Sequence, residues 1–171
     1  YGPGGAVSTV EHLTGLRMEH LAIMDWEGFK DLSTAVGGVK VHVSADTYDT
    51  ENKVRWAEGD YTLKGEKALL YVRQRYGLLR GDFDRIARQQ NFLRSLMRSI
   101  LSGPSLRNPV TVLNTTKVLT RNLTTDEGWS TGQIRGLAWS LRHIRAHDVK
   151  FIMGPVAGTP TDPVYGSIVE L

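Results

Sequence analysis

The sequence contains no cysteine, so neither a disulfide bond nor a thiolate metal site is possible in this chain. No apolar run approaches the roughly 20 residues that a membrane-spanning helix needs, and no stretch has the pattern of a signal peptide. The chain begins at Tyr1 without a methionine. If the whole protein has a membrane anchor, we expect it upstream of Tyr1.

Familiar catalytic and metal-binding motifs are also missing. The sequence has no GxSxG nucleophile motif and no GxxxxGK[ST] phosphate loop. Its histidines do not have the spacing of metal ligands; they are His12, His20, His42, His143 and His147. These absences argue against a serine hydrolase of that type, a P-loop nucleotide site and a zinc centre.

The composition is that of one globular domain. The 171 residues include 40% hydrophobic and 23% charged side chains, which is typical of a folded soluble domain with a core. The pI of about 9.3 is basic. A net charge of only +3 is too small to establish a polyanionic partner by itself.

Helical and strand periodicities alternate along the chain, which predicts an α/β fold with helices covering a sheet. The glycine-rich "YGPGG" is expected to be a turn, and residues 44–60 a polar loop. Helices are expected over residues 7–16, 26–36, 65–75, 83–101 and 110–123, and after a Ser130–Gln133 capping box with a stripe of Leu137, Leu141 and Ile144. Strands are expected over residues 19–26 (buried), 39–43, 149–156 and 167–171.

The helix over residues 83–101 has the clearest pattern. Asp82 occupies the position of an N-cap, and "SGP" at 102–104 ends the helix. Its apolar stripe comprises Ile86, Leu93, Met97 and Ile100.

Arginine is concentrated in "YVRQRYGLLRGDFDRIARQQ" at residues 71–90, which holds five arginines and two aspartates. All seven basic residues between 71 and 98 are arginine. The guanidinium fork matches phosphate oxygens better than an ammonium does. Arg85 lies in the first helical turn, where the dipole disfavours a cation by about 0.3–1 kcal/mol. An anion held between the arginines and the helix start would explain this arrangement.

Other interpretations of the same residues stay open. Arg73 and Arg75 near a helix end, and Arg94 and Arg98 further along, are also compatible with ordinary solvated charges. Asp82 is compatible with a simple cap, and Asp84 with a surface pair to Arg88. A nucleic-acid groove is disfavoured because the segment lacks interleaved aromatics apart from Tyr71 and Tyr76.

The spacing of "YVRQR" and "GDFDRIARQQ" resembles the core motif of the LytR-CpsA-Psr family of bacterial cell-envelope enzymes. Residues 1–43 resemble the family segment before the motif, and residues 59–73 resemble the approach to the arginines. The resemblance covers the whole chain, strongly over 1–101 and more loosely beyond.

The resemblance implies an α/β fold with a central sheet flanked by helices and an apolar lipid tunnel. It also implies an enzyme, a phosphotransferase that moves a glycan with its sugar-1-phosphate from a polyprenyl-pyrophosphate carrier onto peptidoglycan. The expected products are arabinogalactan, teichoic acid or capsule linkages, at the extracytoplasmic face of the membrane. The arginine and tryptophan usage hints at an actinobacterium.

The resemblance assigns roles residue by residue. The pyrophosphate-binding arginines are Arg73, Arg75 and Arg85, with Asp82 and Gln89 completing the site. Arg88 matches the motif and joins the substrate-binding set. We expect Asp82 to orient Arg85 instead of acting as a base, because neighbouring cations stabilise the ionised carboxylate.

The family's upstream Ile-Pro-Arg-Asp-like motif has no counterpart here. Residues 1–171 are therefore expected to be the C-terminal portion of one catalytic domain, with an upstream segment pairing into the same sheet. The resemblance implies Mg²⁺, but its ligands are expected upstream and no metal ligand is assigned in this chain.

Two further alternatives stay open. The stripe from Ile86 to Ile100 and "LAIM" at 21–24 are candidates for either lipid tunnel or ordinary core. The alternative function is a non-catalytic basic module that binds an anionic glycan or nucleic acid. The phosphotransferase interpretation expects a lipid-linked glycan donor, a peptidoglycan acceptor and no nucleic acid.

Overall fold

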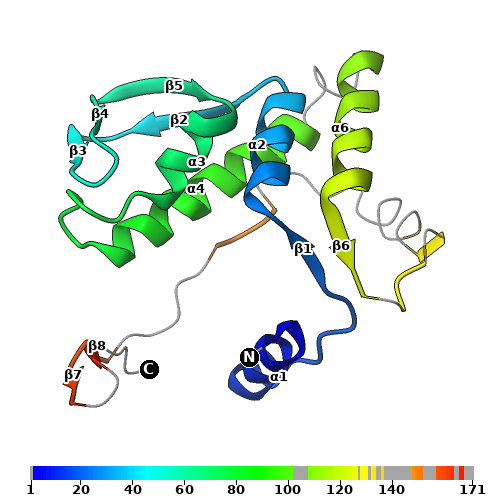
Figure 1. The fold of residues 1–171 in the computed structure, drawn as a ribbon, viewed down its shortest axis with the longest axis horizontal. Coiled ribbons are helices and arrows are strands. Elements are labelled where there is room, and N and C mark those ends of the chain that lie inside the picture. Colours follow the sequence, from blue (N-terminus) through cyan, green and yellow to red (C-terminus); the bar gives the residue numbers. More distant parts are fainter. Residues whose placement is uncertain are drawn as a thin grey trace.

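The computed structural model of the chain describes residues 2–101, 108–126, 128–130, 132–133, 136, 148–151, 157–163 and 166–167. The structure combines helices and strands, which confirms the predicted α/β class (Figure 1). The helices are α1 (Pro3–Thr14), α2 (Trp26–Ala35), α3 (Gly65–Arg73), α4 (Asp82–Leu101) and α6 (Pro109–Asn122). The strands are β1 (Ala22–Met24), β2 (Val39–Val43), β3 (Thr47–Asp49), β4 (Val54–Trp56), β5 (Gly59–Leu63), β6 (Leu123–Thr125), β7 (Thr161–Asp162) and β8 (Gly166–Ser167).

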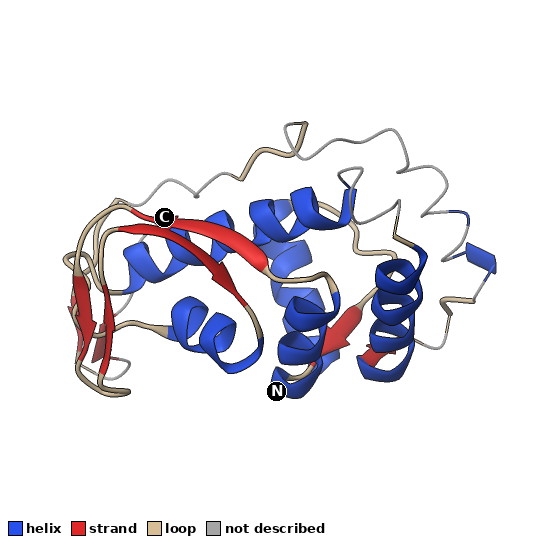
Figure 2. Cartoon of the chain, turned by 90° about the horizontal axis from the view of Figure 1, so that it is seen from above, coloured by secondary structure: helices blue, strands red, loops and turns tan. Residues whose placement is uncertain are grey.

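The described strands pair in four two-stranded antiparallel ladders: β1–β6, β2–β5, β3–β4 and β7–β8. The longest ladder, β2–β5, runs from the pair Val39–Leu63 to the pair Val43–Gly59. It crosses the helices in Figure 2. Strand β2 alternates buried and exposed residues as its sequence predicts, so its valines face the core.

The core lies where β2 meets α3 and α4, with α2 packed on α3 and α6 packed on α2. In Figure 1 the β2–β5 ladder covers α3 and α4 from above. The residues of this core are Leu32, Val36, Val39, Val41, Val43, Trp56, Leu63, Ala68, Leu69, Tyr71, Val72, Phe92 and Leu96. Helix α4 therefore has one side against the core, and its first turn lies close to the end of α3.

Helix α2 has the limits that its sequence predicts. The Asp25 side chain accepts a hydrogen bond from the Gly28 amide at 2.7 Å, which caps its start. Gly37 and Gly38, with φ of 86° and 102°, end it by donating to the carbonyls of Thr34 and Ser33. Helix α6 also confirms its prediction, with Asn108 as its cap.

The prediction of a loop over residues 44–60 is wrong, because β3 and β4 form a hairpin there. The Asp49 carboxylate is buried and accepts bonds from the amides of Glu51 and Asn52, which shapes the turn. Trp56 is buried and contacts Tyr61 and Tyr71 edge to face. Each of these two strands has only three residues, which is too short for periodicity to distinguish a strand from a loop.

Helix α1 begins at Pro3, inside the stretch predicted to be a turn, and ends at Gly15 in the left-handed conformation. Proline suits the first helical position because its missing N–H has no partner there in any case. No residue of α1 is buried, and the helix lies apart from the main body in Figure 1. Strand β1 is also largely exposed, which contradicts its predicted burial.

Helix α4 confirms the predicted long helix, but two details differ. The Arg85 amide donates to the carbonyl of Gly81, so Asp82 is already the first helical residue and not the cap. Phe92 and Leu96 are the buried apolar residues of α4, whereas Leu93 is 44% exposed. The inward face is thus centred beside the predicted stripe, because α4 packs under β2 and against α3 at once.

Near the C-terminus, Ser130 and Gln133 form the predicted capping box: the Ser130 amide donates to Gln133 Oε1 at 2.8 Å, and the Gln133 amide donates to Ser130 Oγ at 3.3 Å. The predicted stripe of Leu137, Leu141 and Ile144 lies outside the described residues. So do most of the predicted strands at 149–156 and 167–171. Among the helices that the structure describes, none is both long and apolar enough to cross a membrane.

Candidate functional site at the junction of α3 and α4

The arginine pair of "RQR" lies where α3 ends. Gln74 leaves the helix with φ −54° and ψ 126°, so the backbone between Arg73 and Arg75 is extended. Residues two apart in an extended segment point to the same side, and the one between them points away. Both arginines are exposed, while Gln74 is only 1% exposed. The Arg73 guanidinium lies over the Trp26 ring at 5.2 Å from its centre.

The first turns of α4 supply the other predicted residues. Asp82 pairs with Arg85 at 2.5 Å, and its role of orienting that guanidinium stays a prediction. The Nε of Arg85 is buried and has no hydrogen-bond partner among the described residues. One turn later, Gln89 donates from Nε2 to the carbonyl of Val72 at 3.1 Å, tying α4 to the end of α3.

Arg88 has a different setting. Its Nη1 donates to Gln74 Oε1 at 2.6 Å and its Nη2 donates to Thr47 Oγ1 at 2.8 Å. The guanidinium lies 4.8 Å from the centre of the Tyr71 ring. Burial lowers the pKa of the Arg88 guanidinium, and burial raises the pKa of the Tyr71 hydroxyl. Arg88 thus joins β3, α3 and α4 through uncharged partners.

Asp84 pairs with Arg80 at 2.8 Å and not with Arg88, so the alternative interpretation of a surface pair between Asp84 and Arg88 is wrong. The Asp84 carboxylate also accepts from the Arg80 backbone amide at 2.9 Å. The hydrogen bond from this backbone amide is the main cause of the lowered pKa of Asp84, and the hydrogen bond from the Arg80 side chain lowers the pKa further. Because Arg80 precedes the helix, the segment before α4 folds back onto its first turn.

The charge balance of the junction favours an anion. Of its five arginines, Arg80 and Arg85 have carboxylate partners. Among the residues that the structure describes, Arg73, Arg75 and Arg88 form no ion pair. Several guanidinium groups without carboxylates are suited to bind phosphate oxygens through paired N–H donors. Arg98 is exposed on α4, as its sequence position predicts, whereas Arg94 lies over the Phe151 ring at 5.3 Å.

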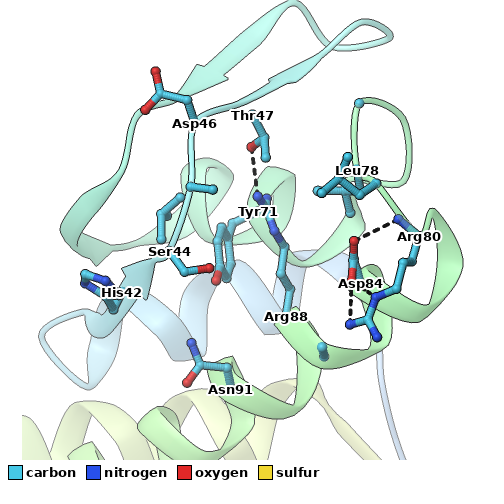
Figure 3. Close-up of a pocket in the computed structure, with 15 residues that line it drawn as sticks. His42, Ser44, Asp46, Thr47, Tyr71, Leu78, Arg80, Asp84, Arg88 and Asn91 are labelled. Atoms are coloured by element: carbon cyan, nitrogen blue, oxygen red, sulfur yellow. Dashed lines mark hydrogen bonds and ion pairs between the residues drawn. The ribbon is translucent and has the colours of Figure 1, made fainter.

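A cavity of about 580 Å³ opens beside α4 (Figure 3). Arg88 reaches across it from α4 to Thr47, with Tyr71 on one side and the Arg80–Asp84 pair on the other. Of the predicted site residues, Arg88 alone lines it. The convergence of Arg73, Arg75 and Arg85 on one phosphate stays a prediction.

Three residues that contact Arg88 were not predicted as site residues: Gln74, Thr47 and Tyr71. Gln74 had a weak signal, because an uncharged residue between two arginines in an extended segment points inward. Thr47 had none, because it lies in the stretch expected to be a loop.

The described residues do not fit a magnesium site. No group of three or more His, Asp or Glu that could hold a metal occurs among them. The two carboxylates at the junction, Asp82 and Asp84, are each paired with an arginine. Magnesium binds through carboxylates and water and needs free carboxylate oxygens.

Comparison with known proteins gives close relatives. The cell wall biosynthesis protein LcpA of Corynebacterium glutamicum is 36% identical over 168 residues, covering 98% of this chain and 32% of LcpA. The polyisoprenyl-teichoic acid–peptidoglycan teichoic acid transferase TagU of Bacillus mycoides is 35% identical over 131 residues, covering 74% of this chain and 42% of TagU. The chain therefore spans between about a third and two fifths of the length of these relatives.

Solved structures have the same fold. The crystal structure of Bacillus subtilis TagV superposes with a TM-score of 0.74 at 24% identity, covering 98% of this chain and 63% of that one. A structure of TagT bound to LIIa-WTA superposes with a TM-score of 0.61 at 26% identity, covering 81% of this chain and 51% of that one.

The family comparison agrees with the motif at the junction. The sequence profile of the LytR_cpsA_psr family matches residues 1–169. This match includes both the "RQR" segment at the end of α3 and the "RQQ" segment of α4. With nearly its whole length matched and a relative of 36% identity, the chain belongs to the LytR_cpsA_psr family.

Proposed function

We propose that the protein to which this chain belongs is a phosphotransferase that moves a glycan with its sugar-1-phosphate from a polyprenyl-pyrophosphate carrier onto peptidoglycan. The observation that carries the proposal is the α3–α4 junction of a LytR_cpsA_psr chain, where Arg73 and Arg75 are exposed and form no ion pair with the described residues. The name of the relative TagU, a polyisoprenyl-teichoic acid–peptidoglycan teichoic acid transferase, supports the substrate class.

The chemistry follows from where charge develops. A hydroxyl of the acceptor, which we propose to be the C6 hydroxyl of N-acetylmuramic acid, attacks the phosphorus next to the sugar. The bond to the bridging oxygen breaks, the lipid phosphate leaves with the electron pair of that bond, and the proton of the attacking hydroxyl passes to solvent. Negative charge grows on the bridging oxygen and the oxygens of the attacked phosphorus. Guanidinium donors placed there beforehand stabilise that charge without reorganising.

Each residue of the junction has a part in this proposal. Arg73 and Arg75 bind the pyrophosphate from the end of α3, and Arg85 binds it from α4. Asp82 holds Arg85 in place through their ion pair. Gln89 already uses one amide hydrogen on Val72, so its second amide hydrogen is the donor left for a phosphate oxygen.

Finer points of the proposal concern the setting. We place the reaction at the extracytoplasmic face of the membrane, with an anchor elsewhere in the protein. The arginine and tryptophan usage motivates an actinobacterial source and arabinogalactan as the glycan. A magnesium ion belongs to the proposal only with ligands from other parts of the protein, since the residues described here do not fit it.

The test is a transferase assay of the whole protein with Arg75 replaced. Arg75→Ala should lower the transfer rate by roughly 10²–10³, comparable with removing one preorganised donor to a developing oxyanion. Arg75→Lys should recover only part of the rate, because an ammonium lacks the planar two-pronged contact. The melting temperature should hardly change, since the Arg75 side chain is exposed.

Arg98→Ala is the matched control, because Arg98 is an exposed arginine of α4. It should keep nearly full activity. Equal losses in both variants would show that the cluster acts only through its overall positive charge. Full transfer in Arg75→Ala with normal melting would remove Arg75 from the mechanism.

The alternative, a non-catalytic module for anionic glycans or nucleic acid, uses the same basic residues. It predicts binding without transfer, and affinity for DNA that falls steeply and linearly on a log–log plot against salt. Detection of a bound polyprenyl phosphate by mass spectrometry of the purified protein would favour the transferase.

A further inference from the structure

The residue between the two exposed arginines is held from several directions. The backbone amide of Gln74 donates to the Leu70 carbonyl at 3.1 Å, which closes the last turn of α3. Its side-chain Nε2 donates to the carbonyl of Tyr76 at 2.9 Å, and its Oε1 accepts from Arg88 at 2.6 Å. Gln74 is nearly inaccessible to solvent. Its side chain therefore fixes the path of the backbone from residue 74 to residue 76.

Burying Arg88 to hold the side-chain amide of Gln74 is energetically unfavourable. Removing a guanidinium from water costs free energy, and hydrogen bonds to uncharged partners offset only part of that cost. Arg88 nevertheless bonds to Gln74 and Thr47, both uncharged, and it lies over Tyr71. Within the described part of the chain it has no carboxylate in ion-pair contact. Its rigid fork can reach two separate acceptors at once, which a hydrophobic residue cannot do.

Two further contacts fix the ends of the same segment. Gln89 donates to the carbonyl of Val72, directly before Arg73. At the other end, Gly77 packs against the backbone of Tyr48 in β3 so closely that no side chain fits. Neighbouring residues of α4, Arg88 and Gln89, thus hold the backbone on both sides of Arg73.

We infer that Gln74 and Arg88 are positioning residues that set the direction of Arg73 and Arg75 toward the pyrophosphate. This inference rests on the proposed function. It gives Arg88 a role other than the phosphate contact that the family resemblance suggests. The Arg88 guanidinium lies in the cavity under β3, and each of its terminal nitrogens donates a hydrogen bond to a protein atom. It acts on the substrate through Gln74.

The test replaces the uncharged Gln74 and the charged Arg88, each alone and both together. Affinity of the whole protein for farnesyl pyrophosphate is measured by calorimetry for Gln74→Met, Arg88→Met and the double variant. Each single variant should bind about tenfold more weakly, and the double variant should be no weaker than either, because both changes break one unit. Arg98→Met is the control and should bind normally.

A second cycle separates positioning from general damage to the fold. In a background that carries both Arg73→Met and Arg75→Met, adding Arg88→Met should lower the affinity less than about twofold, because both arginines that it helps to place are already gone. A merely structural role would lower affinity by the same factor in both backgrounds. In the transfer assay, Gln74→Met should lower kcat more than it raises KM if the arginines act chiefly in the transition state.

Thr47→Val is a milder variant, which removes one partner of Arg88 and keeps the shape of the side chain. It should weaken farnesyl pyrophosphate binding by a few-fold with an unchanged melting temperature, and it carries the test with Gln74→Met if Arg88→Met does not fold. Normal binding in Gln74→Met and Thr47→Val, with weak binding in Arg75→Met, would overturn this inference and leave the proposed function standing. Additive losses for Gln74 and Arg88 would also overturn it. Normal binding in Arg75→Met would instead defeat the proposed site itself.

Discussion

Gly77 shows at the residue scale how closely the arginine segment is packed. Its φ of 76° lies in the left-handed region, and an added Cβ would collide with the carbonyl oxygen of Tyr48. Gly81, four residues later, also has a left-handed φ, of 49°, but open space surrounds its missing Cβ. Substitutions at the two positions therefore distinguish the cost of a left-handed backbone from the cost of a steric collision.

Gly77→Ala should destabilise the protein by more than the roughly 1–3 kcal/mol that a left-handed non-glycine residue costs, because the backbone of β3 must also shift. Gly81→Ala should cost only the conformational part. Urea unfolding followed by circular dichroism measures both. Equal effects of the two substitutions would mean that β3 moves freely away from residue 77.

At the scale of the element, α4 carries two kinds of residue on adjacent positions. Phe92 is fully buried and packs against Phe29 with ring centres 5.3 Å apart. Leu93 is 44% exposed. The predicted stripe thus divides: Ile100 packs against the core, while Leu93 stays available for a lipid. A lipid-binding role for this stripe, and for Ile23 at 40% exposure, stays a prediction.

Phe92→Ala should lower the free energy of unfolding by about 3–5 kcal/mol, because it leaves a cavity between α4 and α2. The control, Leu93→Ala, should cost less than about 1 kcal/mol, since much of its side chain already contacts water. Thermal and urea denaturation of the same protein give both values. A larger loss for Leu93 would show that α4 turns its predicted stripe inward.

At the scale of the whole molecule, the Asp126 carboxylate links β6 to the residues before β1, more than 100 positions earlier in the sequence. Asp126, after β6, accepts from the Leu21 amide at 2.8 Å and from the His20 ring at 3.2 Å. The His20 ring stacks on Trp129 at 4.8 Å. The Leu21 amide is the first cause of the lowered pKa of Asp126, and the His20 side chain adds to it. This contact holds the β1–β6 ladder, which lies outside the main core.

The pH dependence of this contact follows from the sign of the shift. The pKa of Asp126 is lower in the folded protein than its ordinary 3.8, so the contact is fully present above that value. It is lost as the pH falls through the folded pKa. Amide hydrogen exchange in β1 and β6 should therefore accelerate at acid pH before that in β2 and β5, after correction for intrinsic rates.

Asp126→Asn is the matched control for this prediction. It keeps the shape of the side chain and removes the titration, so β1 and β6 should exchange faster at neutral pH without an additional acid step. Simultaneous acceleration of all four strands in the original protein would show that Asp126 does not act locally.

The sequence by itself determined the features that depend on neighbours along the chain. The position of α2, the alternation in β2 and the length of α4 follow from local spacing, and each is found in the structure. The spaced arginines and glutamines of residues 73–90 also indicated the family, which the profile match confirms. Local backbone preference and periodicity are readable without knowing the fold.

Tertiary structure alone decided which residues meet. Thr47 and Arg88 are 41 positions apart and share a bond, and His20 and Asp126 are 106 apart. It also turned Phe92 inward in place of Leu93, and it made Arg88 a partner of Gln74 instead of Asp84. A helix offers several faces of similar polarity, and the surfaces that α3 and β2 present decide which face is buried. Polar contacts between distant elements leave no periodic trace in the sequence, because each partner satisfies a bond that exists only once the chain has folded.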